Sequence, residues 1–84
     1  EVSLEMEKVL NAMPTGIDVK ARRVLELNAD HDVFKKLVEL KDTDPDKLAT
    51  YSRILYGQSL LIEGLHLEDP VAFSEDLCRI MSAG

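Results

Sequence analysis

The chain has 84 residues and a net charge of −6, with 16 acidic and 10 basic side chains interspersed along it. A chain of this length forms one small domain at most, and its acidic balance argues against nucleic-acid binding, which normally needs a basic face. No apolar run approaches the length of about 18 residues that a membrane span needs, so no membrane partner is expected. A single cysteine cannot form an internal disulfide, which fits a cytoplasmic setting.

Residues 3–13 are predicted to form a short helix with one apolar side. Pro14 and Gly16 are expected to end it, because proline disfavours the helical conformation of the residue before it and glycine relaxes the turn. The apolar side, which spans about 100° of a helical wheel, comprises Val2, Met6, Val9, Leu10 and Met13. Methionines at helical spacing usually face a protein core, so a core-facing helix is the ordinary interpretation.

Residues 17–27 are predicted to form a β-strand with one buried face. Apolar and charged residues alternate there, and a period of two is typical of a half-buried strand. The apolar positions are Ile17, Val19, Ala21, Leu25 and Leu27. No second strand is recognisable in the sequence, and an unpaired strand would leave its backbone groups without hydrogen bonds. Because the chain also begins at Glu1 and not at a methionine, we expect a fragment of α+β class whose other strands precede residue 1.

Turn-forming residues at 28–30 are predicted to lead into a short helix, followed by a charged loop over residues 41–47. The buried side of this helix is expected to comprise Val33, Phe34, Leu37, Val38 and Leu40. Asp44-Pro45 and Asp69-Pro70 are the clearest helix starts. In each pair the aspartate can accept hydrogen bonds from free backbone N–H groups, and proline suits the first helical position because no N–H is needed there.

Residues 46–65 are predicted to form one helix of about 30 Å with two apolar faces separated by small or polar residues. The broad face comprises Leu48, Tyr51, Ile54, Leu55, Leu61, Ile62 and Leu65, and the second comprises Ala49, Tyr56 and Leu60. A helix with two apolar faces must be packed from both sides, and we expect this chain to be too short to supply both partners. Gly57 is expected to permit close helix contact, and Gly64 to end the helix.

A last amphipathic helix is predicted to begin at Pro70 and to run antiparallel to the long one, because the connection between them is short. Its main apolar stripe comprises Phe73, Leu77, Ile80 and Met81, extended by Val71 and Cys78. The residues alone leave two possibilities open for the long helix: burial inside a larger monomer, or a dimer interface.

Catalytic and metal chemistry is not indicated. His31, His66 and Cys78 are the only candidates for a nucleophile or a metal ligand, and their spacing matches no ligand motif. Packing explains Cys78, which lies at the edge of an apolar stripe, and helix capping explains Asp69. We therefore expect a domain that is not an enzyme and holds no metal and no cofactor, with an enzyme that works through Cys78 and a histidine as a remote alternative.

Two motifs at a characteristic separation resemble a known family. The segment 23–31 reads Arg-Val-Leu-Glu-Leu-Asn-Ala-Asp-His, and an apolar helix after it leads to Leu-Glu-Asp-Pro at 67–70. This pair closely resembles the C-terminal dimerisation domain of the HtpG chaperones, the bacterial members of the ninety-kilodalton heat-shock family. The resemblance runs from about Val2 to the end of the chain, so residues 1–84 are interpreted as that domain, without the ATPase and middle domains.

The resemblance implies a parent protein that is an ATP-driven, homodimeric, cytoplasmic chaperone and assists the folding of client proteins under stress. ATP and magnesium would belong to its N-terminal domain. The last two helices of each copy would pack into an intermolecular four-helix bundle. The interface assigned in this way comprises Tyr51, Ile54, Leu55, Gln58, Leu61, Ile62, Leu65, Phe73, Leu77, Ile80 and Met81.

The resemblance also implies that the apolar side of residues 3–13 contacts unfolded or partly folded clients. The residues assigned to clients are Val2, Met6, Val9, Leu10 and Met13. An alternative function for the whole chain is a monomeric helical adaptor, which would bind a partner helix in the groove between residues 46–65 and 70–83.

Overall fold

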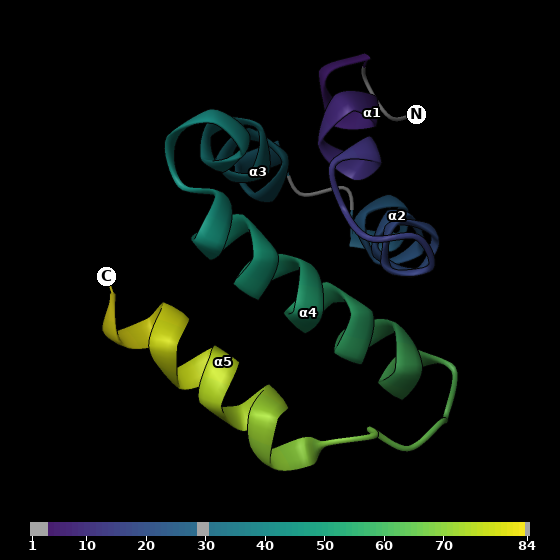
Figure 1. Ribbon diagram of the computed structural model, residues 1–84. Helices are drawn as coiled ribbons and strands as arrows, with labels where there is room; N and C mark the ends of the chain where they lie inside the picture. The colour runs from purple at the N-terminus through teal and green to yellow at the C-terminus, as the bar shows by residue number, and fades with distance from the viewer. Residues whose placement is uncertain (1–3, 29–30, 84) are drawn as a thin grey trace.

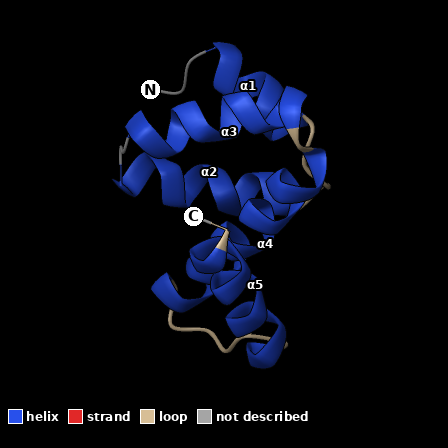
Figure 2. Ribbon diagram, turned by 90° about the vertical axis from the view of Figure 1, so that its left-hand side faces the viewer, coloured by secondary structure: helices blue, strands red, loops and turns tan. Residues whose placement is uncertain are grey.

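Five α-helices make up the part of the chain that the computed structural model describes, residues 4–28 and 31–83. They are α1 (Leu4–Asn11), α2 (Ile17–Asn28), α3 (His31–Thr43), α4 (Pro45–Ile62) and α5 (Pro70–Ser82). Helix α4 runs through the middle, with α1, α2 and α3 on one side and α5 on the other (Figure 1). A second view shows α5 projecting away from α1, α2 and α3 (Figure 2). The molecule is therefore layered about α4.

The predicted strand is wrong, and the α+β class with it, because this segment is helix α2 and the described residues contain helices but no strand. Its sequence also carries a helical spacing: Ala21, Val24 and Leu25 are buried. Val19 and Leu27, which a strand would bury, are 66% and 64% exposed. The charged residues between them are lysine, arginine and glutamate, which are good helix formers. A helix also satisfies its own backbone hydrogen bonds, so no partner strand is needed.

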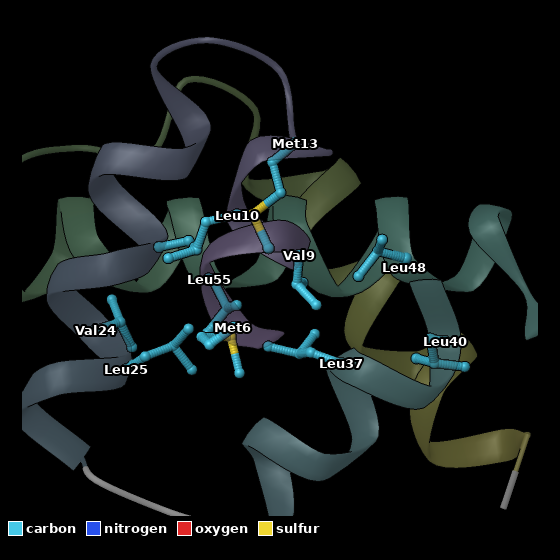
Figure 3. Close-up of a cluster of buried hydrophobic side chains, with 11 residues drawn as sticks. Met6, Val9, Leu10, Met13, Val24, Leu25, Leu37, Leu40, Leu48 and Leu55 are labelled. Atoms are coloured by element: carbon cyan, nitrogen blue, oxygen red, sulfur yellow. The ribbon is translucent and has the colours of Figure 1, made fainter. Parts of the chain in front are cut away.

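The hydrophobic core lies between α1, α2, α3 and one face of α4, as Figure 3 shows. Met6 and Val9 of α1, Ala21 of α2 and Leu37 of α3 are fully buried. The buried cluster comprises Met6, Val9, Leu10, Met13, Ala21, Val24, Leu25, Leu37, Leu40, Leu48 and Leu55, with Ile17, Val33, Phe34, Val38 and Tyr51 packed against it. The buried side predicted for the helix after residue 30 is thereby confirmed.

Both Asp-Pro pairs begin helices as predicted. The side chain of Asp44 accepts a hydrogen bond from the backbone N–H of Lys47 at 3.1 Å. The side chain of Asp69 accepts one from the backbone N–H of Ala72 at 3.0 Å. Each cap satisfies one of the N–H groups that the first helical turn leaves free.

Gly64 ends α4, as expected for a glycine at this position. Its φ is +75°, a conformation that side-chain-bearing residues rarely adopt. The N–H of Leu65 donates to the carbonyl of Leu60 at 2.8 Å, and the N–H of Gly64 donates to that of Leu61 at 3.0 Å. These two bonds form a Schellman motif, so α4 stops at Ile62, three residues before the predicted end.

Helix α4 is packed from both sides, as its two apolar faces predicted, but both sets of partners belong to this chain. One face contacts α2 and α3, and the other contacts α5. The small residues Ser52, Gly57 and Ser59, which separate the apolar faces in the sequence, are themselves buried. Gly57 lets the ring of Phe73 approach α4 closely. The expectation that the chain is too short to supply both partners is therefore wrong in part: both sides of α4 have partners in this chain, but Leu61 and Ile62 of the broad face stay about half exposed.

Candidate functional site

An open apolar groove follows one side of α4 and is the candidate site. Its volume is about 280 Å³. Helices α2 and α3 form one wall and α5 forms the other. The lining side chains are Val24 and Leu25 of α2, Val33 of α3, Tyr51, Ile54, Leu55 and Gln58 of α4, and Leu77 and Ile80 of α5. Because the amide of Gln58 and the hydroxyl of Tyr51 are the only polar groups on these side chains, the groove suits an apolar ligand surface.

The structure brings together six of the eleven residues that were predicted to form the dimer interface. These six line the groove: Tyr51, Ile54, Leu55, Gln58, Leu77 and Ile80. Leu55 also belongs to the core, where it is largely buried. The other five residues lie outside the groove lining, so the predicted set is divided between a groove and its surroundings.

Three of those five residues extend the apolar side of α4 towards its C-terminal end. Leu61, Ile62 and Leu65 are each about half exposed. Leu61 and Ile62 recur at helical spacing with Ile54 and Gln58, which places them on the same side of the helix. Met81, on α5, is 72% exposed. Leu61, Ile62 and Leu65 therefore form an apolar row that continues from the groove into solvent, while Met81 lies near the C-terminal end of α5, at the other end of the helix pair (Figure 1).

Phe73 contacts α4 of its own chain, because its ring packs over Gly57 at the α4–α5 contact. A Cβ atom built on Gly57 would lie 2.5 Å from both Cδ1 and Cε1 of Phe73 and 3.3 Å from Cδ2 of Leu67. Carbon atoms do not approach within 3 Å, so only glycine fits beneath the ring in this arrangement. The expectation that Gly57 permits close helix contact is confirmed.

A polar cluster next to this contact joins α4 to α5. The carboxylate of Asp76 accepts hydrogen bonds from Nε and Nη2 of Arg53, at 2.9 and 3.0 Å, and from Nη1 of Arg79 at 2.9 Å. Nη2 of Arg53 also donates to the hydroxyl of Thr50 at 3.2 Å. Asp76 is only 6% exposed. The hydrogen bonds from Arg53 chiefly, with those from Arg79, lower the pKa of Asp76 against the opposing effect of burial, so the carboxylate is charged at neutral pH.

The sequence reasoning missed this cluster, although one signal for it was present. Asp76 lies three residues after Phe73 and four before Ile80, so it interrupts the apolar stripe of α5. A carboxylate at such a position requires a partner, because a charged group is costly to bury alone. Arg53 on the neighbouring helix is that partner.

Two further groups of charges hold α2 in place. Arg22 makes a two-point contact with Glu7 of α1, with N–O distances of 2.6 and 2.7 Å. Lys20 donates to Glu63, beyond the end of α4, at 2.8 Å. These hydrogen bonds lower the pKa values of Glu7 and Glu63. All four side chains are partly exposed, so each pair contributes little stability.

The side chains assigned to clients lie in the core of this structure. Met6, Val9, Leu10 and Met13 are 0 to 7% exposed, and Val2 lies outside the described residues. The partly open surface expected for them is therefore closed, which matches the ordinary interpretation of a core-facing helix. Contact with clients through these side chains stays a prediction, and it requires α1 to leave the core.

The candidates for catalysis lie apart from the groove lining. Cys78 is exposed on α5, His66 is exposed in the α4–α5 connection, and the side chain of His31 lies outside the described residues. Among the residues that the structure describes, no three histidine, cysteine or carboxylate side chains are grouped to hold a metal ion. None of the described helices is long and apolar enough to cross a membrane.

Comparison with known proteins shows what the chain is similar to. The family model described as Hsp90 protein matches residues 2–84. "Chaperone protein HtpG" of Alkaliphilus metalliredigens is 55% identical over 82 residues, which cover 98% of this chain and 13% of that protein. The protein of the same name in Shouchella clausii is 57% identical over 81 residues, which cover 96% of this chain and 13% of that protein.

The HtpG chaperone of Clostridium botulinum is similar to the same degree, at 56% identity over 81 residues that cover 96% of this chain and 13% of the relative. The chain thus spans about an eighth of the length of the curated relatives that it matches. No solved structure matches the chain.

Proposed function

Because the chain belongs to the Hsp90 protein family, we propose that it is the dimerisation module of a molecular chaperone and corresponds to the C-terminal domain of HtpG. Two copies would associate through the open apolar side of α4 and α5. The four helices would form an intermolecular bundle, in which each copy buries the row of side chains that the other presents.

The single observation that carries this proposal is the apolar groove beside α4 together with the apolar row that leaves it. Leu61 and Ile62 of α4, Leu65 just beyond its end, and Leu77 and Met81 of α5 keep a third or more of their surface in water. An apolar groove with further exposed apolar side chains on the same two helices is unusual on a monomer and marks an interaction site. Association of two copies would remove this apolar surface from solvent, and each Å² buried would favour association by roughly 25 cal/mol.

The activity of the whole protein belongs to the same proposal. A parent chaperone would hydrolyse ATP with magnesium in a part outside these residues, would bind unfolded clients, and would act in the cytoplasm. This chain would then contribute assembly and no catalysis of its own. We do not assign a client contact to the closed α1 surface, since its described side chains are buried.

The test is the mass of the chain in solution over a concentration series. Sedimentation velocity should show a concentration-dependent dimer for the wild type. Leu77→Asp should weaken it by at least about 100-fold, because a charge enters the groove in both copies and each tenfold corresponds to about 1.4 kcal/mol. Val19→Asp is the matched control, because it puts the same charge at an exposed apolar position of α2 and should leave the dimer intact.

A wild-type chain that stays monomeric throughout the series would contradict the proposal. The groove would then fit the alternative function, an adaptor that takes an amphipathic helix of another protein. If Leu77→Asp and Val19→Asp weakened the dimer equally, an interface would exist but would not lie at the groove.

A further inference from the structure

Helix α5 is held on α4 by few side chains. Asp76 is the only one of its residues that is buried, while Phe73 and Ile80 are half-buried. Apolar contacts have little directional preference. Two packed helices can therefore slip by one turn, about 5.4 Å, and still bury apolar surface. The fit of the Phe73 ring over Gly57 favours one register, and a directional polar contact between the helices can select it further.

The carboxylate of Asp76 can select one register of α5 along α4. In the observed register it receives two hydrogen bonds from Arg53 and one from Arg79. A slip of one turn would carry Asp76 to the place of Phe73, against Gly57 and the side chain of Leu67. Arg79 would move with it on the same helix, but Arg53 would be left behind. A buried carboxylate that loses its fork-shaped partner is strongly destabilised, so the slipped register is penalised.

The surroundings of this cluster indicate that it chiefly fixes the position of α5 on α4 and adds little to the stability of the fold. A buried ion pair adds little net stability compared with apolar side chains of the same shape, because removing both charges from water opposes their attraction. Arg53 and Arg79 keep 49% and 60% of their side-chain surface exposed. Both can turn to water if the carboxylate is removed, so loss of Asp76 does not leave a buried cation.

We propose that Asp76, held between Arg53 and Arg79, is a positioning residue that fixes the register of α5 along α4. The register decides whether Leu77 and Ile80 stand opposite Ile54 and form one continuous apolar face with it. The inference rests on the proposed dimer only in its last step, in which the correct register is needed for self-association.

The register can be measured inside one chain, without reference to the dimer. Cys78 is the only cysteine and is exposed on α5, and Ala49→Cys adds an exposed thiol on α4. Nitroxide labels at both sites, with the labelled chain diluted in a large excess of unlabelled Cys78→Ser chain, report one α4–α5 distance by pulsed electron paramagnetic resonance. Asp76→Asn should broaden or shift this distance distribution, while helix content by circular dichroism stays at the wild-type level.

The matched control is Glu75→Gln, which removes the same charge from the neighbouring, exposed position of α5 and should leave the distance unchanged. Arg53→Lys is the second variant and keeps all charges. It removes the two-point contact, so it should also broaden the distribution, and it remains informative if Asp76→Asn fails to fold. A distribution as narrow in both cluster variants as in the control would overturn the proposal, because the Phe73–Gly57 contact would then set the register alone.

Self-association is measured separately by sedimentation of the same variants. Asp76→Asn should raise the dissociation constant of the dimer by about tenfold or more, which corresponds to about 1.4 kcal/mol, and Glu75→Gln should not change it. A shifted distance with an unchanged dissociation constant would overturn the link between register and association. A wild type that is monomeric would refute the proposed dimer, and the positioning role would then stand or fall on the distance within one chain.

Discussion

Replacing Gly57 by alanine tests the contact between α4 and α5 at its narrowest point. Two effects oppose each other. Alanine favours a helix interior over glycine by about 1 kcal/mol. Against this, the new Cβ would lie 2.5 Å from two ring carbons of Phe73 and 3.3 Å from Leu67, and overpacking of this kind costs about 1 to 3 kcal/mol. The ring must turn or α5 must move away.

The overpacking should prevail, because the clash involves two atoms of a ring that is wedged between helices. We expect Gly57→Ala to lower the free energy of unfolding by about 1 kcal/mol. In a domain of this size, that shifts the melting midpoint down by about 4 to 8 °C. Urea titration followed by far-ultraviolet circular dichroism measures the change.

A double-mutant cycle with Phe73→Ala supplies the control. Without the ring, the new Cβ atom has only Leu67 as a close neighbour. Gly57→Ala should then stabilise the chain by up to about 1 kcal/mol. The sign of the Gly57→Ala effect therefore reverses between the two backgrounds. If Gly57→Ala stabilises the wild type as much as it stabilises Phe73→Ala, the Phe73 ring does not lie over Gly57 and the packing argument is refuted.

Two further predictions concern the core and the buried carboxylate. Met6→Ser combined with Leu10→Ser should unfold most of the chain, because two fully buried apolar side chains become polar and each change costs several kcal/mol. Thermal unfolding followed by circular dichroism measures this, with Leu4→Ser at an exposed position as the control. An unchanged melting midpoint together with weaker binding of a client would instead favour the client surface. The pKa of Asp76 is lowered in the folded chain, so its contribution to stability is complete above about pH 4 and disappears as the pH falls through the lowered pKa. The difference in unfolding free energy between the wild type and Asp76→Asn should therefore shrink towards zero in acid, and a difference independent of pH would contradict the charged state.

Local capping chemistry was the part of the fold that could be predicted best. The Asp-Pro starts of α4 and α5 and the glycine end of α4 depend on neighbouring residues only, so the sequence contains all that they need. The α2 segment shows the limit of such reasoning. Its apolar residues at 17, 21 and 25 fit a period of two as well as a helical spacing. Val24 fits only the helix, whereas Val19 and Leu27 fit only the strand, so the sequence alone favoured the wrong pattern.

The candidate site could be predicted in part, because a helical wheel identifies the apolar side of a helix but not the partner that covers it. Tyr51 and Ile54 were assigned correctly to an apolar side that lines a groove. The partners of α4 were misassigned, since the wheel does not show which helices of the chain pack against each side of α4. Pairings such as Arg53 with Asp76, 23 residues apart, depend on the docked position of α5.

The thin attachment of α5 has a consequence for motion. Helices α1 to α4 share one apolar core, to which α5 contributes none of the buried side chains. Detaching α5 therefore exposes less apolar surface than opening the core does, so its free energy should lie below that of global unfolding. Backbone amides of α5 would exchange with deuterium through this partial opening, while exchange of the amides of α1 to α4 would require the whole chain to unfold. The native ensemble then contains a minor state in which α5 is detached and the side of α4 that it covers is exposed. In that state α4 could bind the α5 of a second copy of the chain.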